Sequence, residues 1–125
     1  MTDNIRNHLP PELRLKSSQD FARIFEQNHR VSDRHLLIFG GSNDLEWSRF
    51  GLSVSKKHGN AIQRNRKKRL LREAYRNSRE KIPTGFDWIL IPRVGPEPTF
   101  NDYRRSLVKL TNRLAQQMTE RGNNE

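Results

Sequence analysis

The sequence predicts an α+β fold, a two-layer sandwich in which three helices pack with one small central sheet. Apolar residues recur at helical spacing in three segments, alternate along a fourth, and form two short runs typical of buried strands. The expected order is helix, two or three strands, helix, strand and helix. Only 32% of the 125 residues are hydrophobic, which predicts a thin core beneath a largely charged surface.

A single domain is expected over residues 13–118, because a chain of this length can bury one core but not two. Residues 1–12 are polar and include Pro10-Pro11, so we expect a mobile lead-in. Residues 119–125 are polar and are expected to form a frayed tail.

The first helix is predicted to begin near Ser17. Its hydroxyl can accept hydrogen bonds from the first-turn amides, and Asp20 follows three residues later. Phe21, Ile24 and Phe25 then recur at positions i, i+3 and i+4, which gives this helix one apolar face.

Strands are predicted on both sides of the first polar loop. A short extended piece is expected near residues 30–32, and the run HLLIF predicts a strand at residues 35–39 that ends at Gly40-Gly41. Strict alternation of apolar with small residues over 49–55 predicts a further strand with one apolar face.

The second half of the chain reads as helix, strand and helix. A basic helix is expected from about residue 60 to residue 77, and the run WILI predicts a buried strand at 88–91 that Pro92 stops. The last helix is predicted to begin near Asn101. Its apolar side is expected to contain Tyr103, Leu107, Leu110, Leu114 and Met118.

Positive charge is concentrated in one segment. The formal net charge is +10, and nine of the 24 Lys and Arg residues lie between Trp47 and Arg72, where no acid occurs. The rest of the chain contains the fifteen other basic residues and all fourteen acids, so its net charge is close to zero. This distribution predicts a local contact with a polyanion.

The basic helix divides into two faces. The apolar face is expected to hold Leu70, Leu71, Ala74 and the aliphatic part of Lys67. The other face is a stripe without neutralising carboxylates, which favours RNA phosphates over a merely solvated surface. We call it the basic stripe; its members are Asn65, Arg66, Lys68, Arg69 and Arg72.

Residues around the stripe add to this prediction. Lys56 and Lys57 end the preceding strand, and the turn at Gly59-Asn60 would place Asn60 or the first helical amides opposite an anion. The small residues on one face of that strand, Gly51 among them, admit either a nucleic-acid backbone or a packed helix. The aromatic side chains of Phe21, Phe25 and Phe39 fit an ordinary core, but they would line a groove for unpaired bases if the sheet is partly uncovered.

The search for catalytic and metal-binding groups is negative. The four histidines have no ligand spacing, no carboxylate cluster suits two-metal chemistry, and His58 is expected to be a polar surface residue. The chain has no cysteine, no signal-peptide pattern and no long apolar run, so we expect a cytoplasmic location and no membrane partner.

The segment RFGLSVSKKHGNAIQRNRKKRLLREAYR, residues 49–76, resembles the signature of the bacterial ribonuclease P protein subunit. The likeness centres on SVSKK, GNA and the RNR run, and the flanking DF, IF, HLLIF and WILIPR pieces agree in order and spacing. It covers roughly residues 13–118.

The resemblance implies a specific role. This family supplies the small protein cofactor of a ribozyme that removes the 5′ leader from precursor tRNA, while the RNA subunit carries the active site and its Mg²⁺ ions. No organic cofactor, no protein-bound metal, no catalytic residue in this chain and no DNA partner are implied. The residues implied to contact the RNA subunit are Lys56, Lys57, Arg64, Asn65, Arg66, Lys68, Arg69 and Arg72.

The resemblance also implies a central cleft for the single-stranded leader, lined here by Phe21, Phe25, Leu37 and Phe39. It further implies a left-handed strand–helix–strand crossover, against the general preference for right-handed ones.

The residues alone, without the resemblance, leave two other classes of protein open. One is a general RNA-binding protein of ribosomal or chaperone type without a role in cleavage, and the other, disfavoured by the missing carboxylates, is a protein-only nuclease.

Overall fold

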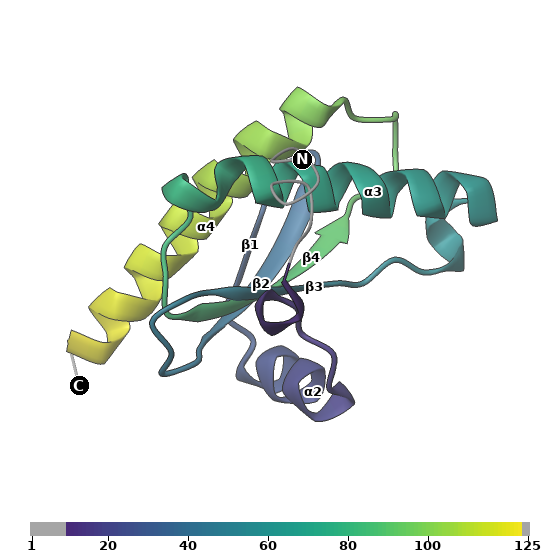
Figure 1. Cartoon of the computed structure of the whole chain (residues 1–125). Coiled ribbons are helices and arrows are strands. Elements are labelled where there is room, and N and C mark those ends of the chain that lie inside the picture. Colours follow the sequence, from purple (N-terminus) through teal and green to yellow (C-terminus); the bar gives the residue numbers. More distant parts are fainter. Residues whose placement is uncertain (1–9, 124–125) are drawn as a thin grey trace.

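Four strands form one mixed sheet in the order β1-β2-β4-β3, in a computed structural model that describes residues 10–123 (Figure 1). The strands are β1 (Arg30–Ser32), β2 (Leu36–Ser42), β3 (Arg49–Leu52) and β4 (Phe86–Pro92). β2 pairs antiparallel with β1 and β4, whereas β3 runs parallel to β4. The extended piece expected near residues 30–32 is thus confirmed as an edge strand.

Helices cover both faces of the sheet. α3 (Ala61–Ser78) and α4 (Phe100–Asn123) pack on one face and α2 (Ser18–Gln27) on the other, below the sheet in Figure 1. Short 3-10 helices occur at Pro11–Leu13 (η1), Lys56–His58 (η2) and Arg79–Lys81 (η3). The predicted α+β fold is confirmed, and α2 adds a partial layer on the second face.

The connections follow from local chemistry. α2 begins where predicted, because Ser17 Oγ accepts hydrogen bonds from the N–H groups of Gln19 and Asp20 at 3.1 and 3.4 Å. It ends at Asn28, whose backbone adopts a left-handed conformation with φ 58°. α3 joins the parallel strands β3 and β4 as a crossover, and the left hand of that crossover stays a prediction.

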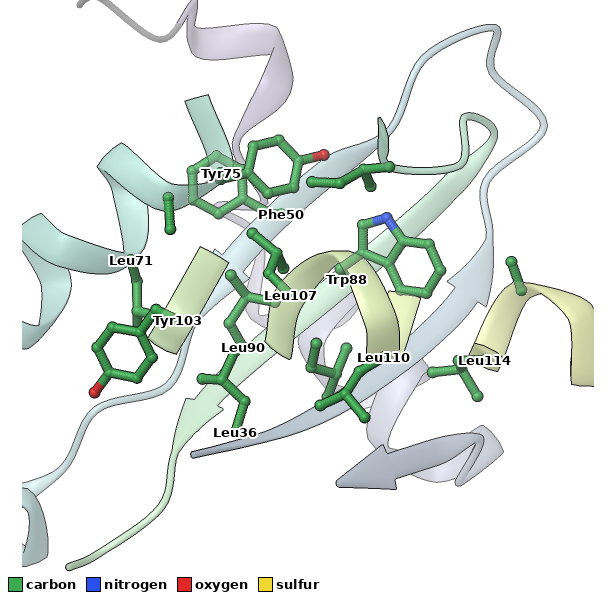
Figure 2. Close-up of a cluster of buried hydrophobic side chains, with 14 of the residues drawn as sticks. Leu36, Phe50, Leu71, Tyr75, Trp88, Leu90, Tyr103, Leu107, Leu110 and Leu114 are labelled. Carbon is green, nitrogen blue, oxygen red and sulfur yellow. The ribbon is translucent and has the colours of Figure 1, made fainter. Parts of the chain in front are cut away.

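The larger core lies between the sheet and the α3–α4 layer (Figure 2). The predicted apolar side of the last helix is confirmed, since Tyr103, Leu107, Leu110 and Leu114 are buried there and Met118 packs against them. Tyr75 of α3 was not part of the predicted core. Its ring stacks on Phe50 of β3 with centroids 4.1 Å apart and an interplanar angle of 19°.

β2 continues through Gly40-Gly41 to Ser42, so the prediction that these glycines end the strand is wrong. Packing is the reason for the glycines. A Cβ on Gly40 would lie 2.8 Å from Trp88 Cζ3, and a Cβ on Gly41 would lie 2.8 Å from Gln27 Oε1. The two residues let the strand pass closely between Trp88 on one face and α2 on the other.

Other boundaries also differ from the prediction. β3 ends at Leu52 rather than near residue 55, because Ser55 becomes the N-cap of η2. α4 continues to Asn123, so residues 119–123 of the expected frayed tail are helical. η1 gives the end of the expected lead-in a defined structure, with Leu13 buried. The rest of the lead-in, residues 1–9, and residues 124–125 lie outside the described residues.

No helix within residues 10–123 is both long and apolar enough to span a bilayer.

Candidate nucleic-acid interface

The basic helix α3 starts with a reciprocal cap. Asn60 Oδ1 accepts the N–H of Gln63, and Gln63 Oε1 accepts the N–H of Asn60, both at 2.8 Å. Ile62 on the same turn is 80% exposed, so the cap rather than apolar packing fixes this turn. Asn60, which is predicted to face an anion, therefore also caps the start of α3.

The inner side of α3 is as predicted, with one partner that the sequence did not indicate. Leu71 and Ala74 are fully buried, and Leu70 packs at the edge of the core. Lys67 is 6% exposed, and its Nζ donates a hydrogen bond to Glu97 Oε1 at 2.6 Å. Glu97 lies in the loop after β4, so this pair ties that loop to the helix.

The outer side of α3 carries the basic stripe. Asn65, Arg66, Arg69 and Arg72 are exposed, and Lys68 is partly exposed. Within the described part of the chain, no carboxylate forms an ion pair with the cations of the stripe; Glu73 instead pairs with Arg76 at 3.7 Å. Like charges at this spacing repel one another and would be relieved by phosphates.

Three further predicted residues lie on η2 and near the start of α3. Lys56 and Lys57 are exposed on η2, and Arg64 is partly exposed on α3. Arg64 Nε is buried and has no hydrogen-bond partner among the described residues. The basic residues that the sequence singled out are thus exposed or partly exposed on α3 and on the preceding η2.

His58 is buried, with 4% of its surface exposed, so the prediction of a polar surface residue is wrong. Its Nδ1 accepts the N–H of Ser55 at 2.9 Å, which places the ring proton on Nε2. Nε2 then donates to the Pro92 carbonyl at 2.7 Å. His58 therefore fastens η2, with Lys56 and Lys57, to the end of β4.

The aromatic residues predicted to line a cleft gather on the sheet face that α2 covers. Phe25 meets Phe39 edge-on with centroids 4.9 Å apart, and Phe21 lies 6.4 Å from Phe25. Leu37 packs with the same group. We call these four residues the aromatic cluster.

The residues of the aromatic cluster differ in how far they are exposed to solvent. Phe25 is 37% exposed, whereas Phe39 is only 8% exposed and lies beneath Phe25 and the guanidinium of Arg30, 5.9 Å from its centroid. Phe21 and Leu37 are partly exposed. Phe39 therefore forms the floor of the cluster, and Phe25 is the ring most open to a base.

A buried carboxylate holds α2 against the sheet. Asp87 of β4 has a fully buried side chain that accepts hydrogen bonds from Arg49 at 2.7 and 2.8 Å and from Arg23 of α2 at 2.9 Å. Asn43 Nδ2 donates to the same carboxylate at 3.0 Å. The hydrogen bonds with Asp87 raise the pKa of Arg49. No local pattern of residues indicates this anchor, which depends on contacts between distant elements.

One hollow is lined both by residues of the basic stripe and by a residue of the aromatic cluster. Its lining includes Lys68 and Arg72 of α3, Phe21 of α2 and Gly51 of β3. A Cβ on Gly51 would overlap Phe21 Cζ. The small face of β3 is therefore packed under α2 at Gly51, which decides between the two readings left open by the sequence. Sequence reasoning did not connect Gly51 to Phe21, because the two residues lie on separate elements, β3 and α2.

Among the described residues, no three His, Asp or Glu side chains lie close enough together to hold a metal ion. The described residues form a charged helix face beside accessible aromatic rings. Such a surface can bind a phosphate backbone and stack unpaired bases.

Comparison with known proteins identifies relatives over most of the chain. The model of the family described as "Ribonuclease P" matches residues 9–115. A ribonuclease P protein component from Clostridioides difficile is 42% identical over 101 residues, which cover 79% of this chain and 89% of the relative. A second, from Alkaliphilus metalliredigens, is 35% identical over 81% of this chain and 92% of the relative.

Solved structures agree with this likeness. The RNase P protein from Thermotoga maritima superposes with a TM-score of 0.74 at 32% identity, over 80% of this chain and 96% of that one. The RNase P protein from Staphylococcus aureus gives a TM-score of 0.70 at 33% identity, over 82% and 94% of the two chains.

Proposed function

Because this chain belongs to the ribonuclease P protein family, we propose that it is the cofactor with which the RNA subunit removes the 5′ leader of precursor tRNA. As a ribonuclease P subunit it takes part in tRNA processing, within an endoribonuclease that is a ribonucleoprotein with RNase P RNA. The proposal assigns separate binding roles to two of its surfaces, the basic stripe and the aromatic cluster.

The basic stripe, with Lys56, Lys57, Asn60 and Arg64 beside it, binds the RNA subunit. Guanidinium groups pair with phosphate oxygens in a bidentate manner, and the stripe offers them without competing carboxylates. His58 supports this contact indirectly, since it holds η2 in place.

The aromatic cluster binds the single-stranded leader. The observation that carries the proposal is the hollow between Phe21 and the pair Lys68 and Arg72, because it places stacking rings next to phosphate-binding cations. A leader strand lying across it would stack bases on Phe25 and Phe21 while its backbone faces the stripe.

The chemistry belongs to the RNA subunit, together with its Mg²⁺ ions. The described residues offer no donor cluster suited to Mg²⁺, and no step is assigned to the protein's own side chains. We place the complex in the cytoplasm, in line with a chain that lacks cysteine and has bacterial relatives.

Replacing Phe25 by alanine is expected to weaken binding of leader-containing precursor tRNA to the assembled complex roughly ten-fold. Binding of mature tRNA should not change, since it has no leader. Phe25 is partly exposed, so the variant should fold. The measurement is equilibrium binding of both RNAs to the chain assembled with a bacterial RNase P RNA.

The matched control is Val94→Ala, which removes an exposed apolar side chain outside the aromatic cluster. A general RNA-binding protein would instead lose affinity for both RNAs alike, or for neither. Equal binding of precursor tRNA by Phe25→Ala and the wild type would contradict the assignment of the leader to this cluster.

A further inference from the structure

Trp47 is a large exposed aromatic residue that the proposed function does not use. It lies in the loop between β2 and β3 and is 41% exposed. Its carbonyl accepts a hydrogen bond from Asn43 Nδ2 at 3.1 Å, and its indole N–H donates to the Glu12 carbonyl at 3.2 Å. The ring is therefore held in position while two fifths of the residue's surface stays open.

A hollow of about 690 Å³ adjoins this ring. This volume falls within the range of roughly 300–1,000 Å³ that is usual for sites of small ligands. Its walls come from η1, the β2–β3 loop, the end of α3 and the segment before β4. The aromatic and charged members of its lining are Trp47, Tyr75, Arg76, Arg79 and Glu80.

Basic residues of α3 extend from the basic stripe to this hollow. Lys68, Arg72 and Arg76 follow one another at intervals of four residues on α3, so Arg76 leads from the stripe into the hollow. Arg79 is exposed beside it, and Arg76 also contacts Glu73 at 3.7 Å. Among the lining residues that the structure describes, Glu80 is the one acid. Two guanidinium groups, those of Arg76 and Arg79, therefore lie at this wall, where Glu80 lines the hollow and Glu73 contacts Arg76.

Tyr75 adds a hydrogen-bonding group to the same wall. Its ring is stacked on Phe50, and Figure 2 shows its hydroxyl pointing away from Leu71 and the centre of the core. Burial raises the pKa of Tyr75. Its hydroxyl, which is protonated at neutral pH like that of an ordinary tyrosine, can donate to a phosphate or a base.

We propose that this hollow binds one unpaired ribonucleotide, with its base stacked on Trp47 and its phosphate beside Arg76 and Arg79. The inference rests on the proposed function, since the RNA reaches the hollow by lying on the basic stripe. The nucleotide can come from the RNase P RNA or from precursor tRNA. Both sources share the chemistry of a free base next to a phosphate.

Fluorescence of Trp47 tests the inference directly. The chain has two tryptophans, and Trp88 is fully buried, so acrylamide quenches mainly Trp47 in the free protein. The Trp47→Phe variant supplies the signal of Trp88 alone. Quenching is measured for the free chain, for its complex with a bacterial RNase P RNA, and after addition of precursor tRNA.

The two sources of the nucleotide give different results. Shielding of Trp47 on assembly with RNase P RNA assigns the nucleotide to that subunit, and shielding only after precursor tRNA is added assigns it to the substrate. Both results support the site. A Trp47 that is as open to acrylamide in both complexes as in the free chain would overturn it.

Affinity provides a second test with matched variants. Trp47→Leu and Trp47→Phe both lose the hydrogen bond to Glu12, but only phenylalanine keeps a ring for stacking. We expect the leucine variant to bind the RNA that protects Trp47 from acrylamide roughly ten-fold more weakly than the phenylalanine variant does. The dependence of binding on salt should be the same in both, because no charge changes.

Equal affinity of the two variants would overturn the inference, whether or not either is less stable than the wild type. The proposed function can fail separately. A wild-type chain that binds neither RNA would remove the proposed function and the nucleotide site together, whereas tight binding with an exposed Trp47 would remove only the site.

Discussion

Replacing Asp87 by asparagine is expected to lower the free energy of unfolding by about 3 kcal/mol, near the lower end of the range for breaking a buried ion pair. Four N–H donors from Arg23, Arg49 and Asn43 converge on the two carboxylate oxygens. An amide has one acceptor atom and one donor group, so its NH₂ group would face two donors. Arg49 would also lose its buried counter-ion, and Arg23 would keep only the longer contact with Asp20. Urea denaturation of the two proteins measures the difference.

Asp20→Asn is the matched control for this prediction. Asp20 also contacts Arg23, at 3.5 Å, but its side chain is 31% exposed. Its loss should cost about 0–1 kcal/mol, as for other exposed ion pairs. The anchor at Asp87 would be refuted by a variant that unfolds within 1 kcal/mol of the wild type, roughly the worth of an exposed pair. Such a result would also mean that Arg23 does not fix the position of α2.

The largest expected effect on binding comes from neutralising the centre of the basic stripe. We expect the triple variant of Lys68, Arg69 and Arg72 to glutamine to bind RNase P RNA roughly 10²-fold more weakly at 0.15 M salt. The slope of log K against log salt should fall by about 2 to 3 units, because each phosphate contact contributes about one. Titrations at several salt concentrations measure both quantities.

A second triple variant separates a local contact from an effect of net charge. Arg34, Arg105 and Arg113 are exposed and lie outside the stripe. Changing them to glutamine also lowers the formal net charge from +10 to +7, since three charges are removed from the total. We expect its slope to stay within one unit of the wild type. Equal losses of slope in both variants would mean that the RNA is bound by the charge of the whole surface.

Local patterns predicted the helices and the basic stripe well. The cap at Ser17, the extent of α3 and the buried side of α4 each depend on residues within a few turns of one another. Spacing along one helix therefore suffices to place Lys68, Arg69 and Arg72 on one side. The four residues of the aromatic cluster were selected with the help of the family resemblance, and the structure brings them together.

Features that depend on contacts between distant segments could not be predicted. His58 lies within the most basic part of the chain, yet it is buried, and its Nε2–H donates a hydrogen bond to the Pro92 carbonyl on another element. The sequence pattern predicts that Gly40-Gly41 end the strand, although β2 continues through them and the Trp88 ring is what excludes a side chain at Gly40. The four donors around Asp87 likewise come from three separate parts of the sequence.

Cleavage of precursor tRNA is the most direct test of the central claim, that this chain assists an RNA catalyst by binding. A precursor with a 5′ leader is incubated at low millimolar Mg²⁺ with the protein alone, with a bacterial RNase P RNA alone, and with both. We predict efficient cleavage at the mature 5′ end only when both are present. Cleavage by the protein alone would contradict the account, and so would a pair that cuts no better than the RNA by itself.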